Sequence, residues 1–310
     1  MTRWRSRVVL IALLATSRAP STAALVFSPG IVHVSTQERA VCCPSPATIQ
    51  QAKTLLQGLG FVVLRASDGL IDSLLVDRAR EDARVELDSM LTRLSKLGFN
   101  TDADSFSFDE VVHRSVRRYD LKLDRRRLAP SSTFHALSEA AAAWSKPVLD
   151  ACGAHEQLEV AVEGVLTSLP GAPHQKFHQD GPLEGSYNCF IPLVDVGVQK
   201  SGTEFWPGSH AHPAVPQLVF SGAIGVDDAA QLATIVGDPS VQVVQPQLAA
   251  GDMLIYQYRV IHRGPANATP FARPIFYCAW SDTAGAGDGH NFKSHRKVQD
   301  LERRQEIFGI

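Results

Sequence analysis

Three residues in the second half of the chain have the types and the spacing to hold a redox-active metal ion. His178 and Asp180 stand two positions apart in the segment HQKFHQDG. On an extended strand such residues point to the same side, so an imidazole nitrogen and a carboxylate oxygen can contact one ion. His262 ends the apolar segment GDMLIYQYRVIH and supplies a third ligand if the fold returns it to this place. Two histidines and one carboxylate are the facial ligand set of non-haem iron(II) oxygenases, which leaves positions on Fe(2+) for a cosubstrate and O2.

An arginine follows these residues at a position that suits an anionic cosubstrate. Arg273 stands 11 residues after His262 and begins the apolar segment RPIFYCAW. A buried guanidinium there can hold a distal carboxylate through two charge-assisted hydrogen bonds. Together with the three metal ligands, such an arginine indicates 2-oxoglutarate as the cosubstrate. Each motif alone arises often by chance, and their order along the chain makes the combination informative.

The elements that must position these residues change in character along the chain. The first half predicts helices and one strand, and after Glu156 short apolar runs alternate with Gly and Pro turns. Runs of this length, separated by turns, are typical of a sandwich or a jelly roll. The fold class expected is therefore mainly β with flanking helices (α+β), a β core with an N-terminal helical layer. In the first half we expect a short helix that begins at Ser45 or Thr48 and is ended by Gly58 and Gly60, followed by a strand at 61–64. Two longer helices are expected at about 69–97 and about 133–152.

The composition excludes several classes of protein. The 310 residues are 45% hydrophobic and 20% charged, which is typical of a globular protein and excludes a disordered or collagen-like chain. Thirty basic and 32 acidic residues give a net charge of −2, so we expect no overall attraction to nucleic acid or to an anionic membrane. The partner expected is a small-molecule substrate, and the composition does not indicate an oligomeric state.

One basic segment, HRSVRRYDLKLDRRRL, lies between the two long helices. We interpret it mainly as a solvent-exposed or acid-pairing face, with an entrance for an anionic substrate as the alternative. Its cationic residues are Arg114, Arg117, Arg118, Lys122 and Arg125–Arg127.

The first 40 residues are expected to be a leader or targeting segment and a linker. Three arginines precede the apolar run Val8–Ala15, small residues follow, and no acidic residue occurs before Glu38. This is the layout of a secretory signal peptide, with an organelle transit peptide as the alternative. The apolar run is too short for a stable membrane span, which needs about 20 residues. We expect one folded domain at 44–285 and a polar C-terminal tail at 286–310.

Several segments together resemble one family. GFVVLR, HQKFHQDG, YNCFIPLVDV, GTEFWPGSH, GDMLIYQYRVIHRGPAN and ARPIFY look like the phytanoyl-CoA dioxygenase family of iron(II)/2-oxoglutarate oxygenases. The resemblance implies a double-stranded β-helix (a cupin-like jelly roll), metal ligands at His178, Asp180 and His262, and 2-oxoglutarate at Arg273. It further implies cosubstrate contacts for Gln179 and Thr203. Asn188, on the strand expected to line the site, is a third candidate for contact with the cosubstrate. Gly264 departs from the family pattern, which often has a serine at this position.

The function expected is a dioxygenase that hydroxylates an unactivated C–H bond of a small organic or acyl substrate and releases succinate and CO2. One alternative is a non-catalytic cupin-like protein that binds a metal and a ligand, and another is a metal-dependent isomerase or hydrolase. The intact His178, Asp180, His262 and Arg273 argue against the binding protein, and an isomerase or hydrolase would have no need for Arg273. Because 2-oxoglutarate and ferrous iron are intracellular supplies, the leader predicts residence in an organelle, either the endoplasmic reticulum lumen or a plastid.

Overall fold

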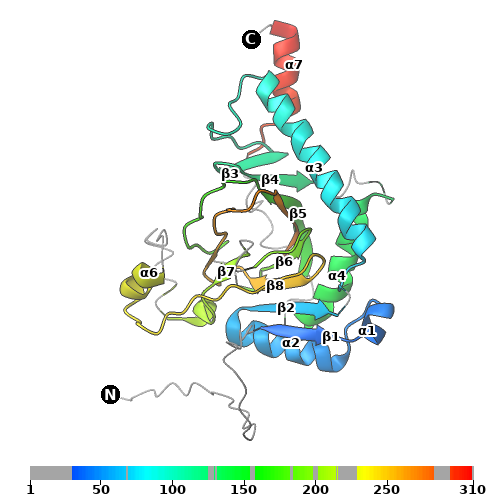
Figure 1. Ribbon diagram of the computed structural model, residues 1–310, viewed down its shortest axis with the longest axis vertical. Coiled ribbons are helices and arrows are strands. Elements are labelled where there is room, and N and C mark those ends of the chain that lie inside the picture. The colour runs from blue at the N-terminus through cyan, green and yellow to red at the C-terminus, as the bar shows by residue number, and fades with distance from the viewer. Residues whose placement is uncertain are drawn as a thin grey trace, which may run out of the picture.

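The computed structural model describes residues 30–67, 69–124, 129, 131–153, 158–181, 184–197, 202–213, 215, 229–282 and 294–308. Its largest feature is one large sheet (Figure 1). This sheet has eight strands in the order β1-β2-β8-β6-β10-β5-β4-β3, and a second sheet pairs β7 with β9. The strands are β1 (Ile31–Val34), β2 (Phe61–Ala66), β3 (Val111–Ser115), β4 (Arg118–Leu123), β5 (Leu158–Ser168), β6 (Tyr187–Pro192), β7 (Glu204–Phe205), β8 (Met253–Gln257), β9 (His262–Arg263) and β10 (Arg273–Asp282). The helices are α1 (Thr36–Ala40), α2 (Pro46–Leu59), α3 (Ser73–Lys96), α4 (Thr133–Ala151), α6 (Ala229–Val236) and α7 (Val298–Phe308).

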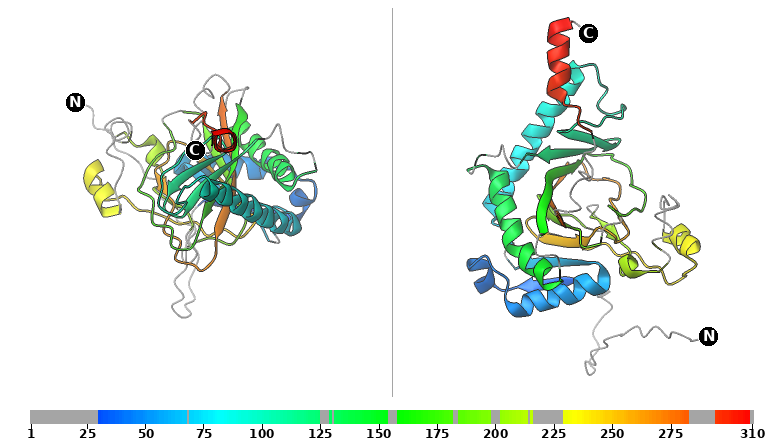
Figure 2. Two further views of the ribbon diagram at one scale, coloured as in Figure 1. Left: turned by 90° about the horizontal axis from the view of Figure 1, so that it is seen from above. Right: turned by 180° about the vertical axis from the view of Figure 1, so that it is seen from behind.

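The sheet bends around an interior, and α3 and α4 lie on its outer side (Figures 1 and 2). Alternation along the strands decides which side chains face the helices and which face the interior. In β6, Cys189 and Ile191 belong to the core under the helices, whereas Asn188 and Phe190 line an interior cavity. The same alternation in β10 turns Tyr277 into the cavity. The central strands thus carry a hydrophobic core on one face and a polar site on the other.

The N-terminal helices begin and end largely where the sequence predicts. The side chain of Ser45 accepts a hydrogen bond from the backbone of α2, and Gly60 ends this helix with a φ of 84°, in the left-handed region that favours glycine. In α3 one stripe at a spacing of three to four residues is buried, which is the face turned to the core. It comprises Val76, Ala79, Ala83, Leu87 and Leu94. In the part of the chain described here, no helix is both long enough and apolar enough to cross a bilayer.

Residues 31–40, expected to belong to a leader and linker, form a strand and a helix of the folded domain. β1 pairs in parallel with β2 and buries Val32 and Val34 in the main core. Directly after it, Ser35 and Glu38 form a capping box that begins α1. β1 forms by pairing with β2, which is distant in sequence. The residues before β1 have a leader-like composition, so the sequence alone did not indicate a strand here. The rest of the expected leader, residues 1–29, lies outside the described residues.

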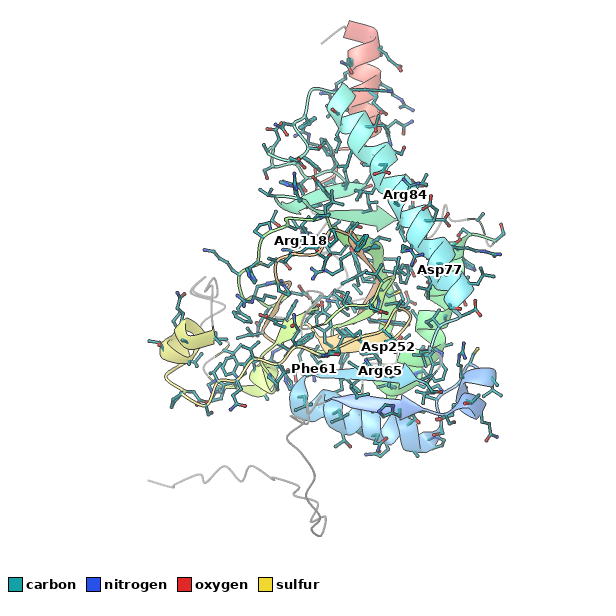
Figure 3. All side chains as sticks on the ribbon, viewed as in Figure 1. Phe61, Arg65, Asp77, Arg84, Arg118 and Asp252 are labelled. Carbon is teal, nitrogen blue, oxygen red and sulfur yellow. The ribbon has the colours of Figure 1, made fainter. Side chains whose placement is uncertain are left out.

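The basic segment also differs from a simple exposed face. Its first part forms the hairpin of β3 and β4, which joins the sheet beside β5. Arg118 is fully buried, and Arg114 reaches the interior cavity, whereas Arg117 is exposed at the turn. In Figure 3, Arg118 lies within the strands, and Arg84 and Asp77 lie on the outer helix α3. Arg125–Arg127 lie outside the described residues.

Residues 298–308 of the expected polar tail form α7, which packs against α3 (Figure 1). Arg93 on α3 binds Glu302 on α7 through two hydrogen bonds of 2.7 Å. Val298 is fully buried in a cluster with Leu94. The polar face of α7 remains exposed, which explains why its sequence looks like that of a tail.

Candidate active site

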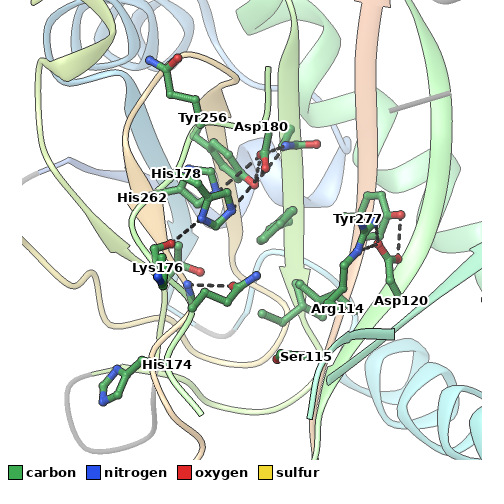
Figure 4. Close-up of a pocket in the computed structure, with 18 of the residues that line it drawn as sticks. Arg114, Ser115, Asp120, His174, Lys176, His178, Asp180, Tyr256, His262 and Tyr277 are labelled. Atoms are coloured by element: carbon green, nitrogen blue, oxygen red, sulfur yellow. Dashed lines mark hydrogen bonds and ion pairs between the residues drawn. The ribbon is translucent and has the colours of Figure 1, made fainter. Parts of the chain in front are cut away.

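The structure brings His178, Asp180 and His262 to one point. His178 Nε2 lies 3.7 Å from Asp180 Oδ1, and His262 Nε2 lies 3.5 Å from Asp180 Oδ2 (Figure 4). Each residue offers one ligand atom, and the three atoms lie within 4.8 Å of one another. Within the described ranges this is the one cluster of three or more His, Cys, Asp or Glu residues arranged for a metal ion.

The two histidines meet because their backbones pair. The N–H of each residue donates to the carbonyl of the other, both at 2.9 Å, in an isolated β-bridge. The backbone of Asp180 then donates to the carbonyl of Tyr258 at 3.0 Å. The segment around His178 is therefore not the regular strand that the sequence suggested. A short extended pairing with the chain before His262 is sufficient to turn His178 and Asp180 to the same side.

Both imidazoles are oriented with Nε2 towards the shared point. His178 Nδ1 lies 2.8 Å from the carbonyl oxygen of Lys176, and His262 Nδ1 lies 3.0 Å from that of Val260. A carbonyl only accepts, so each Nδ1 carries a proton and each Nε2 offers a lone pair. Burial, assisted by the neighbouring His262, lowers the pKa of His178 to about 4. His178 is therefore neutral at neutral pH, as a metal ligand must be.

Asp180 is held by two side chains from the sheet. Its Oδ2 accepts hydrogen bonds from Asn188 Nδ2 at 2.6 Å and from the Tyr256 hydroxyl at 3.0 Å. Burial acts to raise the pKa of Asp180, but His262, His178 and the Tyr256 hydroxyl outweigh it, and the pKa lies below its ordinary value. The carboxylate is therefore charged and fixed in direction. Asn188, expected at the cosubstrate, contacts the carboxylate of the triad.

Arg273 is a buried cation whose donors are not all used. It is 6% exposed, and its Nη2 donates to Ser168 Oγ at 3.1 Å. Its Nε and Nη1 have no hydrogen-bond partner among the described residues. Burial, together with the positive charge of Arg118, lowers the pKa of Arg273 to about 9. A buried guanidinium with two unsatisfied donors favours an anion as its missing partner.

Arg118 and Ser168 complete this end of the site, and sequence reasoning missed both. In the sheet register Ser168 of β5 stands directly opposite Arg273 of β10 and also opposite Arg118 of β4. Arg118 donates to Ser168 Oγ at 2.9 Å and to the carbonyls of Pro173 and Pro265, each at 3.0 Å. Pro173 lies shortly before His178 in the chain, and Pro265 lies shortly after His262. Arg118 therefore also connects the two chain segments that carry the histidines.

One cavity of about 500 Å³ connects the triad with Arg273. Its wall includes the triad and Arg273, and also Gln179, Asn188 and Thr203. Gln179 Nε2 donates to the carbonyl of Arg259, which orients this side chain. The volume lies within the range of about 300–1,000 Å³ found for small-molecule pockets.

Gln175 occupies the space beside Gly264 that a serine side chain at position 264 would fill. Gln175 Oε1 accepts a hydrogen bond from the Gly264 N–H at 3.0 Å, and a Cβ added at Gly264 would lie 2.5 Å from that oxygen. Gln175 therefore brings a polar group to the cavity where Gly264 has none.

Three further residues of the same segments, two of them histidines, lie outside the reacting centre. Trp206 packs with Phe177 in a separate hydrophobic cluster and does not line the cavity. His210 is buried against the carbonyl of Gln57. His174 lines the cavity but is turned away from the triad (Figure 4).

Comparison with known proteins identifies the fold and the family. The family model "Phytanoyl-CoA dioxygenase (PhyH)" matches residues 57–275. The dioxygenase hkm4 of Aspergillus hancockii is 28% identical over 116 residues, which are 34% of this chain and 32% of the fungal protein. The chain therefore matches about a third of the length of this curated relative.

Two solved structures from nogalamycin biosynthesis share the fold. The non-heme alpha ketoglutarate dependent epimerase SnoN is 18% identical, with a TM-score of 0.52 over 77% of this chain and 84% of its own. The carbocyclase SnoK, described in the same terms, is 19% identical, with a TM-score of 0.53 over 75% of this chain and 84% of its own. The expected α+β fold with a cupin-like jelly roll is thereby confirmed.

The family match covers most of the chain and includes all three residues of the triad. The expectation of a 2-oxoglutarate-dependent dioxygenase is confirmed at the level of the family. This chain belongs to the phytanoyl-CoA dioxygenase family of iron- and 2-oxoglutarate-dependent oxygenases.

Proposed function

We propose that this protein hydroxylates an unactivated C–H bond of a small organic or acyl substrate and converts 2-oxoglutarate to succinate and CO2. The observation that carries this proposal is that the triad lines one cavity together with Arg273, a buried cation with two unsatisfied donor nitrogens. A dicarboxylate that reaches from the metal to the guanidinium matches both ends of this arrangement.

The protein's own residues have defined tasks in this reaction. His178, Asp180 and His262 would hold iron(II), which supplies the activation of O2 and the oxidising power. Asn188 and Tyr256 keep the Asp180 carboxylate in place through their hydrogen bonds to Oδ2. Arg273 neutralises and orients the distal carboxylate of 2-oxoglutarate.

The apolar part of the cavity wall would receive the carbon skeleton of the substrate. Leu166, Phe190 and Ile275 line the same cavity as the triad. The ring of Phe190 stands edge-on to that of Tyr256, with 5.0 Å between the ring centroids, so this wall is packed against a residue that holds Asp180. A rigid apolar wall beside the metal limits which C–H bond comes close to it.

The test must separate hydroxylation from other oxidative outcomes, since the two structural relatives are described as an epimerase and a carbocyclase. The protein is reconstituted with iron(II) and 2-oxoglutarate without oxygen, and a metabolite library is screened for compounds that stimulate succinate formation under 18O2. We expect one 18O atom in succinate and one in a product alcohol. A stimulated turnover whose product contains no 18O would contradict hydroxylation.

We also propose that the protein resides in an organelle reached through its leader, in the endoplasmic reticulum lumen or a plastid. The support is the basic, apolar and acid-free composition of residues 1–30, together with the supply of 2-oxoglutarate and ferrous iron inside cells. Fractionation of the tagged protein with N-terminal sequencing tests this. Recovery from the medium, or an uncleaved Met1 in the cytosol, would contradict it.

A further inference from the structure

We infer that the substrate carries a single carboxylate and that Arg114 and Lys176 bind it inside the cavity. This inference rests on the proposed function and adds the chemical class of the substrate. It is carried by a cationic wall of the cavity that the metal site and the cosubstrate do not use.

Arg114 is aimed into the cavity by a buried acid. Asp120 is 2% exposed, and its Oδ2 accepts from Arg114 Nε at 3.0 Å and from Arg114 Nη2 at 2.5 Å. Tyr277 donates its hydroxyl to Asp120 Oδ1 at 2.9 Å, which fixes the carboxylate from the other side. Arg114 is 20% exposed and lines the cavity, and Figure 4 shows this group across from the triad. A guanidinium held in one orientation is suited to bind a planar anion.

Lys176 brings a second positive charge to the same cavity and lies close to the metal ligands. Its side chain is exposed, and its carbonyl accepts from His178 Nδ1 at 2.8 Å. The backbone of Lys176 is thereby fixed relative to His178. An anion bound by Lys176 therefore places the rest of the molecule beside the triad.

The charges of the cavity leave one cation to be neutralised. Among the described lining residues the carboxylates are Asp120 and Asp180, and the permanent cations are Arg114, Lys176 and Arg273. The positive charges of a divalent metal and of Arg273 equal in number the negative charges of Asp180 and of doubly charged 2-oxoglutarate, so these four groups together are neutral. Asp120 balances Arg114, so one positive charge remains. That charge is on Lys176, and a substrate with one carboxylate placed between Lys176 and Arg114 neutralises it.

The experiment uses full-length protein loaded with Mn(II) and saturating 2-oxoglutarate without oxygen. The probes are benzoate, phenylacetate, hexanoate and octanoate, each paired with its primary amide. Enhanced relaxation of probe protons by Mn(II), measured by NMR, reports binding near the metal. We expect the acids to bind at least tenfold more tightly than the amides.

Three variants identify the anchor. Arg114→Gln and Lys176→Gln should each weaken acid binding, with Arg114→Gln reducing it at least tenfold. Arg114→Gln/Asp120→Asn removes the buried charge together with its partner and should reproduce this loss in a folded protein. Arg117→Gln is the matched control, because Arg117 is on the same hairpin but outside the cavity, and it should bind acids as the unaltered protein does.

Equal binding of acids and amides, or no binding of either, would overturn the inference. An acid preference that persists in both Arg114 variants would overturn it as well. Failure of the proposed function gives a different result, namely that 2-oxoglutarate itself does not bind to the Mn(II)-loaded protein.

Discussion

Arg118 and Arg273 lie on either side of Ser168 in the sheet, and both donate a hydrogen bond to its hydroxyl oxygen, at 2.9 and 3.1 Å. Two buried cations thus share one neutral acceptor. Arg118 Nη1 and Arg273 Nε and Nη1 have no hydrogen-bond partner within the described residues. Leaving such donors unsatisfied costs about 1–3 kcal/mol each, and Arg273, which lines the cavity, is placed to receive an anion there.

Replacing Arg273 with leucine should raise the apparent 2-oxoglutarate requirement at least tenfold, because a charge-assisted hydrogen bond contributes about 1.5–3 kcal/mol. Metal affinity should change little, since Arg273 does not contact the triad. Succinate formation at varied 2-oxoglutarate, together with Mn(II) titration, measures both. Arg117→Gln serves as the control for loss of a positive charge. An unchanged 2-oxoglutarate requirement would show that the anchor lies elsewhere.

Replacing His262 with alanine should abolish turnover and weaken Mn(II) binding by more than tenfold. Two remaining ligands cannot hold a labile divalent ion in a fixed position. The readouts are succinate formation and Mn(II) binding by electron paramagnetic resonance. The matched control is His210→Ala, because His210 is buried outside the cavity. Turnover similar to that of the unaltered protein would remove His262 from the site.

Replacing Tyr256 with phenylalanine removes one of the two hydrogen bonds to Asp180 Oδ2 and preserves the ring in the core. Loss of such a supporting contact typically costs about 10–100-fold in metal affinity or activity. We expect a Mn(II) affinity at least tenfold lower, with Asn188 still holding the carboxylate. Tyr187→Phe is the control, because Tyr187 packs under the helices on the other face of the sheet. Equal Mn(II) affinities of the two variants would contradict this role of Tyr256.

Replacing Glu38 with glutamine should lower the free energy of unfolding by about 1 kcal/mol at pH 7. Burial acts to raise the pKa of Glu38, but hydrogen bonds from Ser35, Ser45 and Thr48 outweigh it, and the pKa is lowered. A lowered pKa stabilises the fold above the unfolded value of about 4.3, and this contribution is lost as the pH falls through the folded value.

The difference between the Glu38→Gln variant and the unaltered protein should therefore shrink steadily below about pH 4. Urea unfolding at several pH values measures it. A difference that does not depend on pH would show that the charge of Glu38 does not stabilise the start of α1 and α2.

Much of the site could be predicted because its chemistry lies in short motifs. His178 and Asp180 are close in sequence, and His262 and Arg273 stand near the ends of apolar runs, so residue type and order were sufficient to place them together. The local backbone was less predictable. The segment of His178 forms an isolated bridge, which depends on pairing with His262 rather than on its own sequence.

The remaining residues could not be predicted because their roles depend on strand register. Arg118 stands in a basic run that looks exposed, and only the pairing of β4 with β5 places it opposite Ser168 in the interior. Ser168 ends an apolar strand and carries no motif. β1 could not be predicted for the same reason, because it forms only through pairing with β2.

The central claim is that the triad and Arg273 form one site for 2-oxoglutarate and a divalent metal. The most direct measurement is calorimetric titration of 2-oxoglutarate into the full-length protein without oxygen, with and without iron(II). Binding should be at least tenfold tighter with iron(II) present, and at least tenfold weaker in Arg273→Leu than in Arg117→Gln. A 2-oxoglutarate affinity that is independent of iron(II) and equal in the two variants would contradict the claim.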